Sequence, residues 1–168
     1  MHTLTSQQIA FKSAASKFPS GVVVAITNYD DTWHGMTISS FTTISLDPLL
    51  VMIAVSNRSK MHDLLKQQDA CKFSISILAD DQSNVSNHFA GQKREEISND
   101  LENNVIHLND HTVIKNCLSY FLCELDESIN KGDHTLYFGR VIDSQTTPTD
   151  TNPLVYYSRS YHSLTQKI

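Results

Sequence analysis

Hydroxyl-bearing side chains cluster in one short segment of this chain, directly after Gly35. Thr37, Ser39 and Ser40 all lie in this segment. On a strand they would offer hydroxyls and backbone N–H groups to a polar ligand, and the missing side chain of Gly35 would let a ligand approach the backbone closely. An edge strand that meets only water has the same composition, so the pattern alone leaves both interpretations open.

A candidate anion site follows an apolar run later in the chain. It consists of Ser56, Asn57, Arg58, Ser59 and Lys60. Ser59 is a suitable N-cap for a short helix, and the free N–H groups of a helix start, together with Arg58 and Lys60, can bind phosphate. The alternative is an ordinary helix start with solvated charges. Lys93 and Arg94 are a second basic pair, but two glutamates follow directly, which favours a solvated turn.

Metal chemistry is weakly indicated. His107 and His111 are four residues apart, as in a helix-borne ligand pair. However, no Glu follows His107 and the segment is not convincingly helical. Cys117 and Cys123 lack the spacing of a zinc ribbon. We therefore expect no metal site, and we expect these cysteines and Cys71 to be small core residues on strands.

Composition excludes several classes of protein. The chain has 168 residues, a formal net charge of −5 and five glycines, and neither G-x-G-x-x-G nor G-x-x-x-x-G-K-[ST] occurs. The mildly acidic balance argues against a broad nucleic-acid surface. No apolar run reaches about 18 residues, so no membrane span is expected. With no signal-peptide pattern and an odd number of cysteines, a cytoplasmic protein is the simplest interpretation.

The elements that must position these residues are mostly strands. Residue patterns predict strands over 21–27, 33–40, 49–55, 73–77, 117–125, 134–142 and 153–157. Helices are predicted from Thr5, a capping-box residue, to Phe18, then after Ser59, and around 85–89. Alternating serines within 73–77 indicate a half-buried strand. This inventory predicts a mainly β fold with a few short helices, whose sheet closes into a barrel to remove exposed edges.

Five segments together carry a resemblance to a known family. They are FPSGVVV at 18–24, HGMTISSF at 34–41 leading to SLDP at 45–48, FAG at 89–91, GDHTLYFGRV at 132–141 and PLVYYSRSY at 153–161. In this order and spacing the chain resembles the short-chain NAD(P)H:flavin oxidoreductases, the reductase components of two-component flavin-dependent monooxygenases. The resemblance runs from about Phe11 to Leu164. It implies one flavin reductase-like domain over 1–168, a split β-barrel of the FMN-binding type, and a homodimer.

The resemblance also implies an activity. A hydride would pass from nicotinamide C4 of NADH or NADPH to N5 of FMN or FAD, and the reduced flavin would serve a partner monooxygenase. This reaction needs the positioning of two rings rather than acid–base residues, so the lack of a Ser/His/Asp constellation is consistent with it. The alternatives are a flavoprotein that holds FMN tightly, as an electron carrier or a reductase of another substrate, and a non-catalytic flavin-binding module.

The resemblance assigns site residues in two groups. The flavin would contact Met36, Thr37, Ile38, Ser39, Ser40, the segment Ser56, Asn57, Arg58, Ser59 and Lys60, and Phe89 with Ala90. The nicotinamide nucleotide would contact His134, Tyr157, Arg159 and Tyr161. Alternatively, His134 could be bonded only to its own turn, and Arg159 could form only a cation–π pair.

Overall fold

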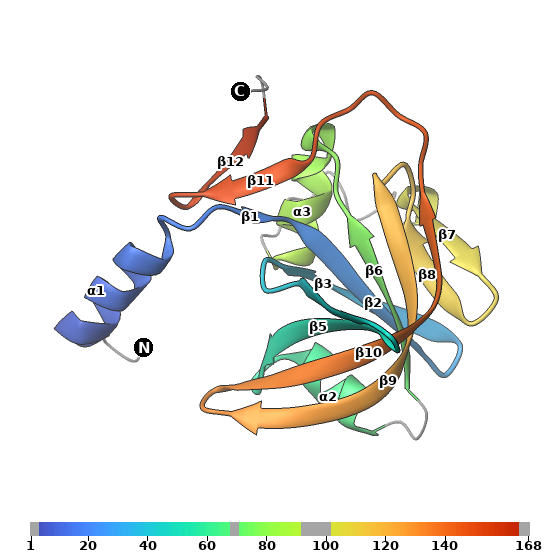
Figure 1. The fold of residues 1–168 in the computed structure, drawn as a ribbon, viewed down its shortest axis with the longest axis horizontal. Helices are drawn as coiled ribbons and strands as arrows, with labels where there is room; N and C mark the ends of the chain where they lie inside the picture. Colours follow the sequence, from blue (N-terminus) through green and yellow to red (C-terminus); the bar gives the residue numbers. More distant parts are fainter. Residues whose placement is uncertain (1–3, 68–70, 92–101, 165–168) are drawn as a thin grey trace.

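The computed structural model describes residues 4–67, 71–91 and 102–164 (Figure 1). These residues form the helices α1 (Ser6–Ala15), α2 (Lys60–Gln67) and α3 (Ser83–Phe89), and 3-10 turns at Asp80–Gln82 and Glu102–Asn104. The strands are β1 (Ser20–Gly21), β2 (Val23–Tyr29), β3 (Thr32–Ile38), β4 (Thr42–Leu46), β5 (Leu49–Ser56), β6 (Lys72–Ile77), β7 (Val105–Leu108), β8 (His111–Ile114), β9 (Ser119–Lys131), β10 (His134–Thr146), β11 (Leu154–Tyr157) and β12 (Ser160–Ser163). The prediction of a mainly β chain with short helices is confirmed. No helix in these ranges is long and apolar enough to cross a membrane.

Seven strands form the main sheet, in the order β3-β2-β6-β9-β10-β5-β4, and every neighbouring pair is antiparallel. β3 and β4 are the two edges, so hydrogen bonding among the described strands does not close this sheet into a barrel. A small sheet of β1, β11 and β12 and the hairpin β7–β8 lie beside it. The short strands β1, β4, β7, β8 and β12 were not predicted as separate elements.

Both faces of the main sheet are covered, and β2 shows why. Val23 and Ala25 point into one apolar cluster, whereas Val24 and Ile26 point into a second. Successive strand residues face opposite sides, so a continuous apolar run such as this one is buried on both faces. Helix α2 packs on the first cluster, and Phe89 at the end of α3 packs on the second.

β6 is buried on both faces, so the prediction of a half-buried strand is wrong. Ser74 and Ser76 are 0 % exposed. The β7–β8 hairpin covers them: Ser74 Oγ donates to the carbonyl of Thr112, and Ser76 Oγ accepts from the N–H of Ile114 at 3.0 Å. Because each buried hydroxyl has a hydrogen-bond partner, serine is compatible with a central strand.

Helix α1 begins as predicted but buries nothing. The capping box is formed, since Gln8 N donates to Thr5 Oγ1 at 3.2 Å and Thr5 N donates to Gln8 Oε1 at 2.9 Å. No residue of α1 is buried, Phe11 is 73 % exposed, and Phe18 is 80 % exposed. Figure 1 shows this helix projecting from the sheet, and we call residues 4–18 the arm.

Candidate functional site

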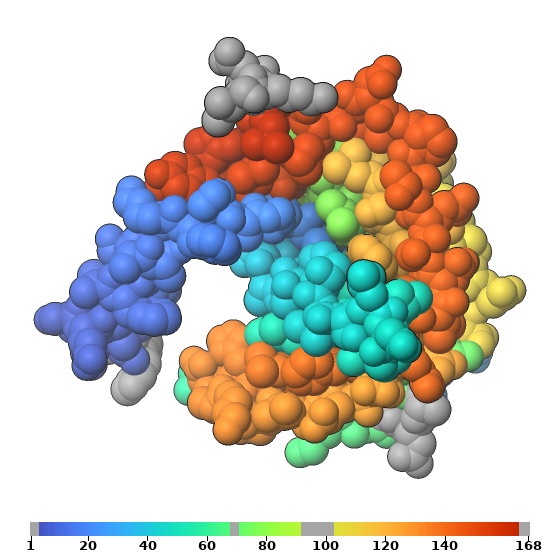
Figure 2. Space-filling view, in the orientation of Figure 1, coloured from blue at the N-terminus to red at the C-terminus, as the bar shows by residue number. Residues whose placement is uncertain are grey.

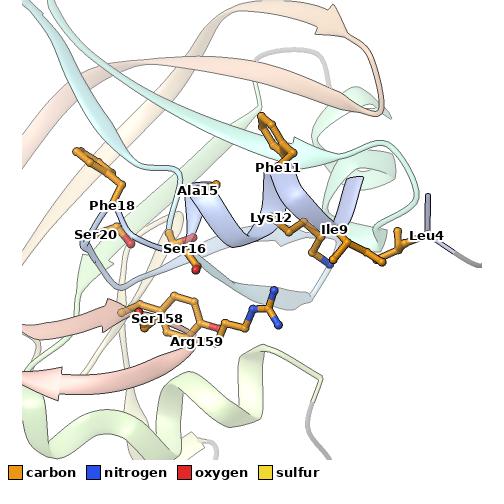
Figure 3. Close-up of a pocket in the computed structure, with 12 residues that line it drawn as sticks. Leu4, Ile9, Phe11, Lys12, Ala15, Ser16, Phe18, Ser20, Ser158 and Arg159 are labelled. Carbon is orange, nitrogen blue, oxygen red and sulfur yellow. The ribbon is translucent and has the colours of Figure 1, made fainter. Parts of the chain in front are cut away.

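Two adjoining pockets lie where the arm, the end of β3 and the β11–β12 hairpin meet. The smaller has a volume of about 350 Å³ and is lined by Val22, Thr37, Ser39, Asn87, Ala90, Tyr156, Arg159, Ser160 and Tyr161. The larger, of about 560 Å³, lies against α1 and includes Ile9, Phe11, Lys12, Phe18 and Arg159 (Figure 3). Ser39, Tyr156 and Arg159 line both pockets. The structure therefore brings Thr37, Ser39, Ala90, Arg159 and Tyr161 together, as the predicted contacts require.

The β11–β12 hairpin decides which tyrosines face these pockets. Tyr156 pairs with Tyr161, and their rings lie 5.6 Å apart between centroids, on the pocket side. Tyr157 is one residue further along, so its side chain leaves on the other face, where it contacts Lys17 and His162. Tyr157 does not line either pocket. Tyr156, which the sequence interpretation omitted, takes that place, because strand side chains alternate.

The turn of this hairpin holds Arg159 in an unusual conformation. Ser158 and Arg159 have φ values of 48° and 67°. Two consecutive residues of this kind match the type I′ turns of two-residue hairpins, which non-glycine residues adopt at a cost of roughly 1–3 kcal/mol each. Figure 3 shows the Arg159 guanidinium extending toward α1. Among the described residues it has no carboxylate partner, so its charge is available to an anionic ligand.

Helix α3 forms the floor of the smaller pocket. Thr37 Oγ1 donates to the carbonyl of Ser86 at 2.7 Å, and the Ser86 hydroxyl shares a hydrogen bond with Tyr161 OH at 2.8 Å. Phe89 lies directly over Gly35, where an added Cβ would stand 2.6 Å from the ring. The Phe89 side chain is thus part of the core, and the hydroxyl of Thr37 is already used. Ser86 was missed because only the fold brings it to these strands.

The segment predicted to bind phosphate lies at the start of α2. Ser59 is the N-cap, since its Oγ accepts from the N–H of His62 at 3.2 Å. Lys60 instead turns to the β2–β3 hairpin, where its ammonium donates to Tyr29 OH at 3.0 Å. Arg58 is exposed and forms no ion pair in the described chain. Arg58 and the free N–H groups of the helix start therefore remain available to an anion.

His134 lies beside this segment, at the start of β10. It pairs with Ser56 across the sheet, and its Nδ1–H donates to Asp133 Oδ1 at 2.8 Å. The hydrogen bond from His134 holds the pKa of Asp133 below its usual value. With Nδ1 occupied, Nε2 is the atom left to face a ligand.

The side chain of Ser40 joins the end of β3 to β5, the strand that leads to the segment 56–60. Ser40 Oγ donates to the carbonyl of Ala54 at 2.8 Å and accepts from its N–H at 3.2 Å. β5 then continues to Ser56. Met36 and Ile38 point the other way, into the first apolar cluster, so any ligand contact of theirs would use the backbone.

The histidine and cysteines considered for a metal site have structural roles in the part of the chain that the structure describes. Burial lowers the pKa of His111, whose Nε2 is 3.3 Å from the Cys123 carbonyl, and raises the pKa of Cys123 to about 12. Cys71 and Cys117 are also buried free thiols. Within the ranges described, no three His, Cys, Asp or Glu side chains are grouped to hold a metal. Lys93 and Arg94 lie outside those ranges.

One family of known proteins matches almost the whole chain. The profile of the flavin reductase like domain matches residues 15–165. The chain belongs to this family and is therefore an oxidoreductase of the flavin reductase class, as its sequence motifs predicted.

Individual relatives are similar over almost their whole length. An NADH-dependent flavin reductase of Rhodococcus sp is 36 % identical over 156 residues, covering 91 % of this chain and 84 % of the relative. The reductase component of 4-hydroxyphenylacetate 3-monooxygenase of Thermus thermophilus is 35 % identical, covering 92 % and 95 %. The solved structure of flavin reductase PheA2 superposes with a TM-score of 0.83 at 33 % identity, covering 97 % of this chain and 100 % of that one.

Proposed function

We propose that this protein transfers a hydride from NADH to FMN or FAD at the paired pockets around Ser39 and Arg159. The observation that supports the proposal is that Ser39 and Arg159, which line both pockets, lie within the range that matches the family. Pockets of about 350 and about 560 Å³ lie in the range of small-molecule sites, roughly 300–1,000 Å³. NADH is favoured over NADPH because the relative from Rhodococcus sp is named as NADH-dependent.

The donor set fits a flavin. Ser39 lines the smaller pocket beside Ala90, and Tyr156 and Tyr161, whose rings contact each other, line the same pocket. A flat ring system with a polar edge needs this combination of hydrogen-bonding groups and aromatic surface. Arg58 and the start of α2 would hold the phosphate. When bound, the flavin supplies the electron-accepting ring atom, which the protein itself lacks.

His134 and Arg159 are the proposed contacts of the nicotinamide nucleotide. Arg159 offers a guanidinium that suits the pyrophosphate in charge and geometry. His134 offers Nε2 on a ring that Asp133 orients. These residues hold and orient the nucleotide. Neither is assigned a proton transfer, because hydride transfer between two aligned rings requires none at these atoms.

We further propose that residues 1–168 are a single domain and that the curved sheet is a split β-barrel. The Ser40–Ala54 contact supports the barrel, because it joins the end of β3 to β5 although the two strands are not neighbours in the sheet. Figure 2 shows open space between the arm and the rest of the molecule, which leaves room for another chain. The uncovered apolar side chains of α1 support a homodimer in which a second copy packs on the arm.

A monooxygenase is the proposed recipient of the reduced flavin. The Thermus thermophilus relative is named as the reductase component of such a system, and the chain covers 95 % of its length. A reductase of this kind must release its product, so its site should be open. The shared position of Ser39, Tyr156 and Arg159 at the junction of two pockets is consistent with that requirement.

Steady-state assays with two flavins and two nucleotides test the proposal. Purified protein is mixed with FMN or FAD and with NADH or NADPH, and the absorbance of the reduced nucleotide is followed. We expect flavin-dependent loss of NADH absorbance. No loss in any of the four combinations would overturn the proposal. Dialysis before the assay tests the rival function: a protein that stays yellow and active without added flavin holds its flavin as a prosthetic group.

A further inference from the structure

Asn57 connects two parts of the chain that are far apart in sequence. Its backbone N–H donates to the carbonyl of Asp133 at 3.0 Å. Its side-chain Nδ2 donates to the carbonyl of Gly132 at 3.4 Å, and its Oδ1 accepts from Thr135 Oγ1 at 2.8 Å. One residue shortly before α2 thus forms hydrogen bonds with the β9–β10 turn on both sides of His134.

These contacts occupy both ends of the Asn57 amide. The oxygen faces the hydroxyl of Thr135, which is only 4 % exposed, and the nitrogen faces backbone of the turn. An amide engaged at both ends is held in one orientation by the protein. The side chain therefore links two segments of the chain.

The linked segments carry different proposed ligands. Arg58, which follows Asn57 directly, belongs to the proposed phosphate site, whereas His134 belongs to the proposed nucleotide site. We propose that Asn57 is a positioning residue, which acts through the β9–β10 turn to hold His134 at the nicotinamide nucleotide. This inference rests on the proposed function, because it takes His134 as a nucleotide contact.

Two variants remove the link from opposite sides. Asn57→Ala deletes the amide, and Thr135→Val deletes the hydroxyl that donates to it while keeping a side chain of similar shape. Asn130→Ala is the matched control, because Asn130 Nδ2 donates to the same Thr135 Oγ1 at 3.2 Å from the exposed side. It removes a hydrogen bond from Thr135 without touching Asn57.

The expected result is a split between kinetic constants. We expect Asn57→Ala and Thr135→Val each to raise the KM for NADH about tenfold, the scale of one lost hydrogen bond, with a smaller change in kcat. The double variant should add little to either single one, since both break the same link. Asn130→Ala should leave both constants near wild type. If KM stays unchanged in both single variants while only the melting temperature falls, Asn57 is merely structural and the inference is overturned.

Hydrogen exchange of the protein without ligands separates this inference from the proposed function. If the link exists, Asn57→Ala and Thr135→Val speed exchange of the amides at 132–136, and Asn130→Ala does not. An inactive wild-type protein that shows this pattern would contradict the assigned reaction and, with it, the role of the link in nucleotide binding. An active wild-type protein whose turn exchanges equally in all variants would contradict the positioning role alone.

Discussion

The β9–β10 turn and the arm are both exposed parts of this chain, yet they are held in place very differently. Three hydrogen bonds from Asn57 hold the turn, two of them made by its side chain. The arm is attached near its end, where Ser158 N donates to the carbonyl of Ser16 at 2.9 Å and Lys17 donates to Ser158 at 3.2 Å. No residue of α1 is buried.

This difference indicates which of the two parts is held in place by contacts within a single chain. A helix shorter than about 12–15 residues is marginal in water unless an apolar face packs on something. α1 has 10 residues, and its apolar side chains contact little of the rest of the described chain, which we call the body. The turn, in contrast, is ordered by its own neighbours. The turn that carries His134 is therefore held by the body alone. The arm, which lines the larger pocket beside Arg159, requires a covering surface, for which a second copy is the proposed source.

The largest effect is expected from a methyl group placed inside the body. In Gly35→Ala the new Cβ would stand 2.6 Å from the Phe89 ring, which also packs against Trp33. Such overpacking destabilises by roughly 1–3 kcal/mol. Gly21→Ala is the control, since no atom lies within 4 Å of a Cβ built there. Chemical denaturation should separate the two variants, and equal unfolding free energies would contradict the packing of α3 on β3.

Substitutions in the arm should weaken dimer formation and leave the stability of the fold unchanged. Phe11→Ser combined with Phe18→Ser removes its two most exposed rings, which are 73 % and 80 % exposed. We expect light scattering to change from dimer to monomer, while the denaturation midpoint measured at low protein concentration changes little. Ile142→Ser, at another exposed apolar position, should leave the dimer intact. A double variant that remains dimeric would place the interface elsewhere.

Acid should weaken the body before it affects the arm. Burial lowers the pKa of His111 below 6.5, despite the opposing effects of the Cys123 carbonyl, Asp110 and Glu124. The unfolded chain therefore binds this proton first, and stability present above about pH 6.5 is lost as the pH falls toward the lower folded pKa.

The comparison of His111→Gln with wild type measures this contribution. Glutamine can still donate to the carbonyl of Cys123 but does not titrate. Below pH 6.5 we expect the unfolding free energy of His111→Gln to change less steeply with pH than that of wild type. Part of the remaining slope comes from His34, whose pKa is also lowered by burial. His162→Gln, at an exposed site, is the control. Parallel slopes in wild type and His111→Gln would show that His111 does not stay neutral in the fold.

The smallest effect is expected at the capping box of the arm. Thr5→Ala removes the acceptor for the N–H of Gln8 and should cost about 1 kcal/mol of helix stability. Because the arm is separate from the body, hydrogen exchange in α1 should accelerate while the global unfolding midpoint stays the same. Ser13→Ala, which leaves the cap in place, should do neither. A shift of the global midpoint would mean that α1 unfolds together with the sheet.

Local signals in the sequence predicted much of this fold. The capping box at Thr5, the N-cap at Ser59 and the buried apolar run in β2 depend on neighbours within a few residues, and all three are present. The family motifs predicted residues at the pockets, including Ser39 and Arg159. Whether these residues bind the assigned ligands stays a prediction.

Features that depend on distant partners were not predictable in this way. Tyr156 was missed in favour of Tyr157 because the register of the β11–β12 hairpin decides which ring faces the pocket. The burial of β6 follows from the β7–β8 hairpin, which begins about thirty residues later. The contacts of Asn57 with Gly132 and Thr135 span 75 and 78 positions, so only the fold reveals that it joins two segments.

An anaerobic titration measures hydride transfer from NADH to the flavin directly. Oxidised flavin is mixed with catalytic amounts of the protein, NADH is added stepwise without oxygen, and the visible absorption of the flavin is recorded. We expect each equivalent of NADH to bleach one equivalent of flavin, quickly with wild type and far more slowly with Arg159→Ala or His134→Ala. Flavin that stays oxidised with wild type under these conditions would contradict hydride transfer by this protein.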